Sequence, residues 1–226
     1  MLIVSYFIVL LLSILFSKIE AKKPLSEVFK VHSYGVISIG MVFAFVFQGV
    51  WFTVSLTIGG DLNFTAFPSL RGYESYAVYS FPLAFLLYVV FAVFGAFVEE
   101  VTFRGYVQSR IASRQGHVIG ISVASLFFSL QHIRIFNWSW MVEFLQTQFI
   151  YVFCFGIFVG YLFVKSEQDI WSVFTFHAVM NIINISLPIK ATYRLPFSTQ
   201  IVAIVSFVFL MLLLRLVSIE ELIHGP

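Results

Sequence analysis

Charged residues divide the chain into long apolar stretches whose lengths match the thickness of a lipid bilayer. A membrane-spanning helix needs about 17–25 predominantly apolar residues, because its backbone rises only about 1.5 Å per residue. The pattern therefore predicts an all-α integral membrane protein, a polytopic bundle of about seven transmembrane helices. The stretches free of Asp, Glu, Lys and Arg are 1–17, 35–60, 75–98, 115–133, 144–164, 170–189 and 195–214.

Composition indicates a lipid rather than an aqueous environment. Hydrophobic residues make up 60% of the 226 positions and charged residues 11%, whereas a soluble domain carries about 25% charged residues. The net charge of +2 is too small to indicate nucleic-acid binding, and the single cysteine, Cys154, supports neither an internal disulfide nor a Cys-rich metal site. No repeat or long linker interrupts the chain, so residues 1–226 are expected to form one membrane domain.

The distribution of Lys and Arg between the connecting loops predicts the orientation of the chain, because these residues are enriched on the cytoplasmic side. With the N-terminus outside, the cytoplasmic loops hold eight Lys and Arg residues and the outer loops hold four. We therefore expect an outer N-terminus and a cytoplasmic C-terminus, in the cell membrane rather than the endoplasmic reticulum. Residues 1–17 lack the basic region and cleavage site of a signal peptide and are expected to remain as the first span.

Three polar clusters interrupt the apolar stretches, and ionisable residues inside a membrane are functional candidates by default. Residues four apart share one face of a helix, so Glu100 is expected to pair with Arg104. Glu99 lies about 100° around the helix from Glu100 and therefore faces different surroundings. The clusters consist of Glu99, Glu100 and Arg104 at the end of the third stretch, Phe128 and His132 in the fourth, and His177 and Asn181 in the sixth.

The depth of the clusters in the membrane is also predictable. The third and fourth stretches are expected to form a helical hairpin with its turn near residues 113–117. Glu99 and His132 are equally far along the chain from the centre of that turn, about 25 Å at the helical rise. We therefore expect the clusters to converge on one cavity buried among the helices and reached by water from the cytoplasmic side. Candidate residues for lining this route are Thr102, Gln108, Ser109, Ser113 and Gln115.

The three motifs, Glu-Glu-x-x-x-Arg, Phe-x-x-x-His and His-x-x-x-Asn, each lie on a hydrophobic stretch and follow one another in this order. In this they resemble the CPBP family of intramembrane proteases, also called ABI-domain proteins, which includes the type II CAAX prenyl endopeptidases. The resemblance covers a motif-bearing core at residues 75–190. It implies an endopeptidase that hydrolyses a peptide bond in a membrane-associated protein or peptide. A prenylated CAAX-type protein would be one such substrate.

The resemblance also implies a role for each motif residue. Glu99 would activate a water molecule as general base, with help from His132. His177 and Asn181 would donate hydrogen bonds to the tetrahedral oxyanion, and removal of one such donor costs about 3 kcal/mol in other acyl-transfer enzymes. The supporting residues are Glu100, Arg104 and Phe128.

A metal-dependent mechanism is the rival to this scheme. Glu99, His132 and His177 make a plausible zinc set that leaves a fourth position for water. The chain lacks His-Glu-x-x-His, the pattern that places two zinc ligands and the base on one helix. We therefore favour a mechanism without a cofactor, with zinc as the alternative.

A non-enzymatic function is the alternative from a different class. The polar clusters would then belong to an immunity-type binding protein or to a proton-coupled transporter. A transporter is expected to show repeat symmetry between its halves, and none is evident. A degenerate immunity protein is expected to lose motif residues, and all of them are present. The sequence leaves open the identity of the substrate and whether it is prenylated.

Overall fold

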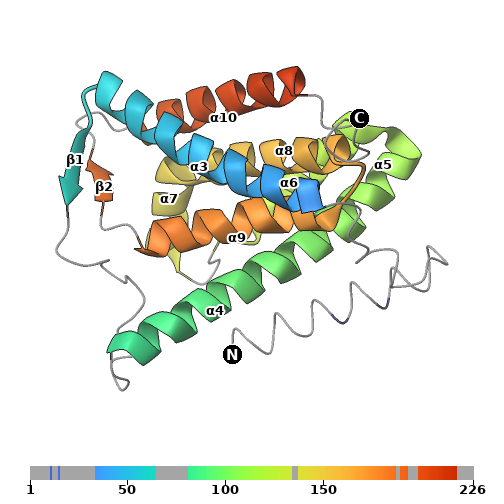
Figure 1. Ribbon diagram of the computed structural model, residues 1–226, viewed down its shortest axis with the longest axis horizontal. Helices are drawn as coiled ribbons and strands as arrows, with labels where there is room; N and C mark the ends of the chain where they lie inside the picture. Colours follow the sequence, from blue (N-terminus) through green and yellow to red (C-terminus); the bar gives the residue numbers. More distant parts are fainter. Residues whose placement is uncertain are drawn as a thin grey trace.

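The structure, a computed structural model, describes residues 11, 15, 34–64, 81–133, 137–186, 189–192 and 198–217, and these form a helical bundle (Figure 1). Long apolar sequences adopt helices because a helix satisfies its backbone hydrogen bonds internally, as lipid requires. The helices are α3 (Tyr34–Thr57), α4 (Phe81–Glu100), η2 (Val101–Gln108), α5 (Ser109–Gln115), α6 (His117–Leu130), α7 (Trp138–Thr147), α8 (Phe149–Lys165), α9 (Ile170–Ser186) and α10 (Ser198–Leu216).

The predicted all-α membrane fold is confirmed. Six of the seven predicted stretches coincide with helices, and the stretch at residues 1–17 lies almost entirely outside the described part of the chain. Within the described residues, three continuous helices are long and apolar enough to cross a membrane, at Tyr34–Thr57, Phe85–Gln115 and Ser198–Leu216.

The remaining helices differ from the simple picture of straight spans. The predicted stretch at residues 144–164 includes the end of α7 and most of α8, which are bent by 59° where they meet at Gln148 and together are long and apolar enough to form one broken span. Helices α6 and α9 contain 14 and 17 residues and are shorter than a typical span. The bundle therefore combines full spans with shorter helices that pack among them.

The predicted hairpin turn is present at Gly116. Helices α4, η2 and α5 form one continuous rod up to Gln115, so Arg104 lies within a helix and not in a connecting loop. At Gly116 the backbone has φ +89°, a conformation that favours glycine, and α6 begins at the next residue. The chain thus reverses direction where the sequence predicted it.

Helix α9 lies at the centre of the bundle, where it packs against both α3 and α4, while α8 packs against α6 and α10 (Figure 1). The contact between α3 and α9 is very close at Gly40. A Cβ atom built on Gly40 would lie 2.2 Å from the carbonyl oxygen of Ser172, a backbone atom that cannot move by itself. The hydrophobic effect does not drive helices together in lipid, so their association depends on close packing. Small residues such as Gly40 allow this close approach.

Two short strands, which the sequence analysis did not predict, form an antiparallel pair at one end of the bundle. Strand β1 (Asp61–Phe64) follows α3, and strand β2 (Ile189–Thr192) follows α9. Asp61 pairs with Thr192 and Phe64 with Ile189. The pair joins the ends of α3 and α9, the two helices that contact each other at Gly40.

The close approach at Gly40 predicts a position-specific effect of alanine. Gly40→Ala should destabilise the protein by about 1–3 kcal/mol, the usual cost of overpacking, because the new methyl group meets the α9 backbone. Gly49→Ala on the same helix is the matched control, since its Cβ would meet no atom within 4 Å. Unfolding of both variants in detergent measures the difference, and equal stabilities would contradict the predicted contact.

Candidate active site

A buried ion pair lies where α4 continues into η2. Glu100 is fully buried, and Arg104 is 1% exposed. Arg104 Nη1 donates a hydrogen bond to Glu100 Oε1 at 3.3 Å, as the spacing of four residues predicted. Arg104 Nε also lies 3.3 Å from Glu100 Oε2, close enough for an ion pair but without the alignment of a hydrogen bond. The guanidinium therefore balances the charge of a carboxylate that water does not reach.

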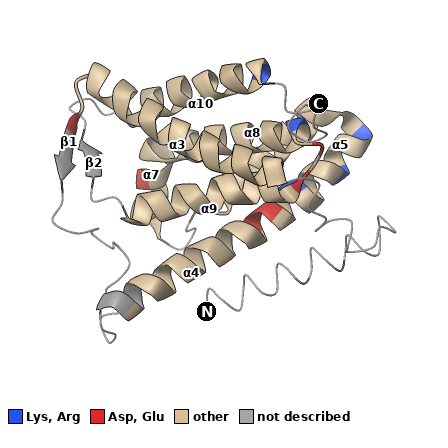
Figure 2. Ribbon diagram, viewed as in Figure 1, with Lys and Arg blue, Asp and Glu red and all other residues tan. Residues whose placement is uncertain are grey.

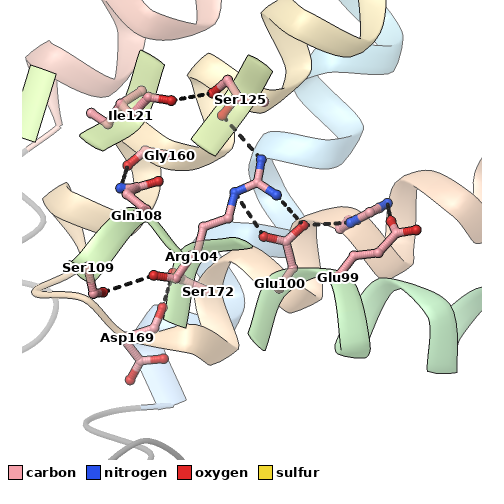
Figure 3. Close-up of polar contacts among 12 residues, drawn as sticks. Glu99, Glu100, Arg104, Gln108, Ser109, Ile121, Ser125, Gly160, Asp169 and Ser172 are labelled. Carbon is pink, nitrogen blue, oxygen red and sulfur yellow. Dashed lines mark hydrogen bonds and ion pairs between the residues drawn. The ribbon is translucent and has the colours of Figure 1, made fainter. Parts of the chain in front are cut away.

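His177 from α9 lies between the two adjacent glutamates (Figure 3 shows the two glutamates and Arg104). Its Nδ1 is 2.7 Å from Glu100 Oε1, and its Nε2 is 3.8 Å from Glu99 Oε2. Glu99 and His177 are both buried, with exposed fractions of 8% and 6%. Because an ionised carboxylate accepts hydrogen bonds only, Nδ1–H must be the donor to Glu100, which orients Nε2 toward Glu99. The first and third motifs thus meet directly.

Phe128 joins the second motif to the other two. The guanidinium carbon of Arg104 lies 4.6 Å from the centroid of the Phe128 ring, in cation–π geometry. The same ring lies 5.1 Å from the His132 ring and 6.0 Å from the His177 ring, centroid to centroid. The aromatic side chain of Phe128 is therefore the common neighbour of the three motifs.

His132 and Asn181 lie at the margins of this arrangement. His132 Nδ1 hydrogen-bonds the carbonyl oxygen of Phe128 at 2.9 Å, and its ring stacks on Phe144 of α7 at 6.2 Å. Asn181 Nδ2 donates to the carbonyl oxygen of Ala92 at 3.2 Å. Ala92 precedes Glu99 by seven residues, about 10 Å along α4. The contacts described for the two side chains are with these neighbours on α6, α7 and α4.

Helix α8 contributes backbone acceptors to the site, which the three motifs did not indicate. Arg104 Nη2 donates to the carbonyl oxygen of Gly156 at 3.2 Å, and Gln108 Nε2 donates to that of Gly160 at 2.9 Å (Figure 3). The donors are four residues apart on η2, and the acceptors are four residues apart on α8. Gly156 and Gly160 form a G-x-x-x-G pattern, a known sign of close helix packing in membranes that could have indicated this contact.

The prediction that Gln108 lines a water route to the site was wrong. Gln108 is only 1% exposed and its amide is bonded to Gly160, so its side chain faces α8. The hydroxyl of Ser109 donates to the carbonyl oxygen of Arg104 at 2.9 Å. Ser113 and Gln115 are exposed near the end of α5. Polar character alone did not show which of these residues contact water, because η2 is covered by α6 and α8.

The arrangement also bears on the zinc alternative. Among the described residues, no three side chains of His, Cys, Asp or Glu are grouped closely enough to hold a metal ion. Glu99 and His177 are adjacent, whereas the described contacts of His132 are with aromatic rings and a backbone carbonyl. The proposed set of Glu99, His132 and His177 therefore does not fit a three-ligand zinc site in this arrangement.

The paired glutamates, the arginine and the two histidines all lie between the start of α4 and the end of α9. Residues 81–183 match the family model of Rce1-like type II CAAX prenyl endopeptidases. The match confirms the resemblance that the motifs indicated, and the Rce1-like segment contains all seven motif residues. Over this segment, which is just under half of its length, the chain is similar to the type II CAAX prenyl endopeptidases. No curated protein matches the chain.

The burial of the ion pair predicts a large effect of removing its cation. Arg104→Met should destabilise the protein by about 3–5 kcal/mol, because Glu100 would be left as a buried charge without its main partner. Arg114→Met is the matched control, since Arg114 is exposed on α5 and surface substitutions usually change stability by less than about 0.5 kcal/mol. Unfolding in detergent reports both changes, and a stable Arg104→Met protein would show that Glu100 is not held as described.

Proposed function

We propose that the protein is an intramembrane endopeptidase in which Glu99 activates a water molecule. The observation that supports this most directly is the position of His177, which is held by Glu100 at 2.7 Å and faces Glu99 at 3.8 Å inside an apolar bundle. A general base, an oriented imidazole and a low-polarity surrounding are the parts that hydrolysis of a peptide bond requires. The family match supports the same class of reaction.

In the proposed reaction, the Glu99 carboxylate takes a proton from water as the water oxygen attacks the carbonyl carbon of the peptide bond. The carbonyl oxygen becomes an oxyanion that accepts hydrogen bonds from the protein. Protonated Glu99 then passes the proton to the leaving amine as the carbon–nitrogen bond breaks. Atoms and charge balance with water as the only co-reactant.

The remaining site residues assist in this scheme. With Nδ1–H directed at Glu100, the Nε2 atom of His177 can donate to the oxyanion only when the ring carries both protons. Such a ring and Arg104 would together balance the charges of Glu99 and Glu100. Asn181 would have to exchange its bond to Ala92 for the oxyanion, and His132 would assist the attacking water from the Phe128 side.

The proposed substrate is a membrane-associated protein or peptide, and a prenylated CAAX-type substrate is the form to test first. A lipid-anchored substrate is held at the bilayer, where a site within the helices can be reached. The proposed mechanism needs no cofactor, since the base and the donors are all side chains of the protein.

The proposed role of Glu99 predicts a difference between glutamates. Glu99→Gln should reduce cleavage of a farnesylated fluorogenic peptide about 10²–10⁴-fold, the range for removing a general base, while the protein stays folded. Glu100→Gln should instead lower the unfolding temperature, because Glu100 holds Arg104 and His177. Glu143→Gln, an exposed acid on α7, is the control and should change neither.

Two results, one from this comparison of variants and one from a chelation experiment, would contradict the proposal. An active Glu99→Gln variant beside a dead but well-folded Glu100→Gln variant would exchange the roles of the two acids. Loss of activity after exhaustive chelation, restored by added zinc, would replace the cofactor-free mechanism with a metal-dependent one. Full activity after chelation, with bound metal measured by mass spectrometry as absent, is the expected result.

We further propose that the end of the bundle formed by α5 is cytoplasmic. Basic residues gather at this end, where Figure 2 shows them on α5 and at the ends of α8 and α10. Among the described residues they are Arg110, Arg114, Lys165 and Arg215, whereas Lys190 belongs to β2 at the opposite end. The enrichment of Lys and Arg on the cytoplasmic side supports this orientation, with the C-terminal end of α10 cytoplasmic, whereas the predicted outer N-terminus lies outside the described residues.

Thiol labelling tests this orientation with a pair of exposed positions at opposite ends of the bundle. In a protein whose native Cys154 is replaced by alanine, Ser113→Cys on α5 should react with a membrane-impermeant reagent only after the cells are opened. Thr57→Cys at the end of α3 should react in intact cells. Labelling of Ser113→Cys from outside would reverse the topology.

A further inference from the structure

A cavity of about 280 Å³ lies away from the paired glutamates, between α3, α9, the start of α10 and the junction of α7 with α8. Three aromatic side chains form part of its wall, Phe47, Trp51 and Tyr151. The Trp51 and Tyr151 rings meet edge to face at 5.4 Å. The cavity is thus built by four helical regions that are far apart in the sequence.

The polar part of the wall carries no charge. It consists of three carboxamides and two hydroxyls besides that of Tyr151, namely Gln48, Gln148, Asn184, Thr147 and Thr199. Polar side chains inside a membrane are costly and usually serve a function. Gln48 lies well inside the apolar span Tyr34–Thr57, and Asn184 and Tyr151 line the same cavity from α9 and α8. Hydrogen-bonding groups from four helical regions therefore converge on one uncharged space.

We propose that this cavity is a subsite that binds an uncharged polar segment of the peptide substrate. The inference rests on the proposed function and adds a requirement on the substrate. Carboxamides offer both a donor and an acceptor, which match the N–H and C=O groups of a peptide and the side chains of Asn, Gln, Ser and Thr. The aromatic walls supply a flat apolar surface for the aliphatic parts of the same segment.

The distance from the reacting groups fits a peptide in extended form. Asn184 follows His177 by seven residues, two turns of α9, which correspond to about 10 Å. On α8, Tyr151 precedes Phe155 by four residues, and the Phe155 ring lies 4.8 Å from the His177 ring. An extended peptide rises about 3.3 Å per residue, so the subsite lies about three residues from the bond that is cleaved.

The size and charge of the cavity limit what it can hold. Small-ligand pockets measure about 300–1,000 Å³, so a cavity of 280 Å³ accepts one or two residues and not a folded domain. A charged side chain would enter without a counter-ion among the lining residues, and burial of an unpaired charge is costly. The subsite should therefore select Asn, Gln, Ser or Thr over Asp, Glu, Lys or Arg at that position.

Direct binding tests the subsite without any requirement for catalysis. The probe is N-acetyl-Ala-Asn-Ala-amide, added to the Glu99→Gln protein in lipid nanodiscs and followed by tryptophan fluorescence. The Trp51→Phe variant should lose the signal, because Trp51 lines the cavity. The probe with Asp in place of Asn should bind at least roughly tenfold more weakly. Equal binding of both probes, or binding of methyl glucoside but not of either peptide, would overturn the proposal.

Matched substitutions test which side chains bind the probe. Gln48→Leu and Asn184→Leu should each weaken binding roughly two- to tenfold, the usual effect of one lost hydrogen bond. Gln146→Leu is the control, because Gln146 is exposed beside the cavity but does not line it. Unchanged binding in both cavity variants would remove the carboxamides from the proposed site.

The cleavage assay separates failure of this inference from failure of the proposed function. If the wild type cleaves the farnesylated peptide, Gln48→Leu and Asn184→Leu should raise KM roughly two- to tenfold with kcat nearly unchanged, because they act on binding. Cleavage with unchanged KM in both variants would overturn the subsite alone. Probe binding by a wild-type protein that cleaves no peptide would instead overturn the proposed function and leave the binding site standing.

Discussion

The complete burial of the Glu100 carboxylate is the constraint on which the rest of the site depends. An ion of this size without partners in a medium of low polarity costs several kcal/mol, so its charge must be balanced by groups brought from elsewhere in the fold. Arg104, one turn along the same rod, supplies the cation, and His177 from α9 supplies a short hydrogen bond. Arg104 in turn donates to the backbone of Gly156 on α8. Three helical segments are therefore held together by the groups that stabilise one buried carboxylate.

Close packing provides the geometry in which these bonds form. In lipid, helices gain little from the hydrophobic effect, and small residues with interhelical hydrogen bonds decide how closely they approach. Gly40 lets α3 contact the backbone of α9, while Gly156 and Gly160 let α8 approach α6 and η2. A Cβ on Gly156 would lie 2.9 Å from that of Ser125. The same short separations bring the carbonyl oxygens of α8 within reach of Arg104 and Gln108.

The different positions of the two adjacent acids in this network suit them to different roles. Glu100 is occupied by Arg104 and by Nδ1 of His177, whereas Glu99 faces the other nitrogen of the imidazole. One acid thereby fixes the arginine and the imidazole, and in the proposed mechanism the second would exchange a proton with water. The eight-residue π-helix η2 begins directly after this pair, and such wide helical segments are frequent at functional sites. The proposed peptide subsite lies further along α8 and α9, toward the end of the bundle opposite the basic residues.

The sequence by itself determined the properties that depend on local spacing. The apolar stretches specify membrane helices, the interval of four residues specifies the Glu100–Arg104 pair, and the polar segment at residues 113–117 specifies the hairpin turn. These features follow from the length and period of a helix, which are the same in every protein. Only the tertiary structure decided that His177 bonds Glu100 while Asn181 bonds Ala92, that Gln108 is buried against Gly160, and that the chain bends at Gln148. These contacts depend on the distances and rotations between helices far apart in the chain, and the period of a single helix carries no information about them.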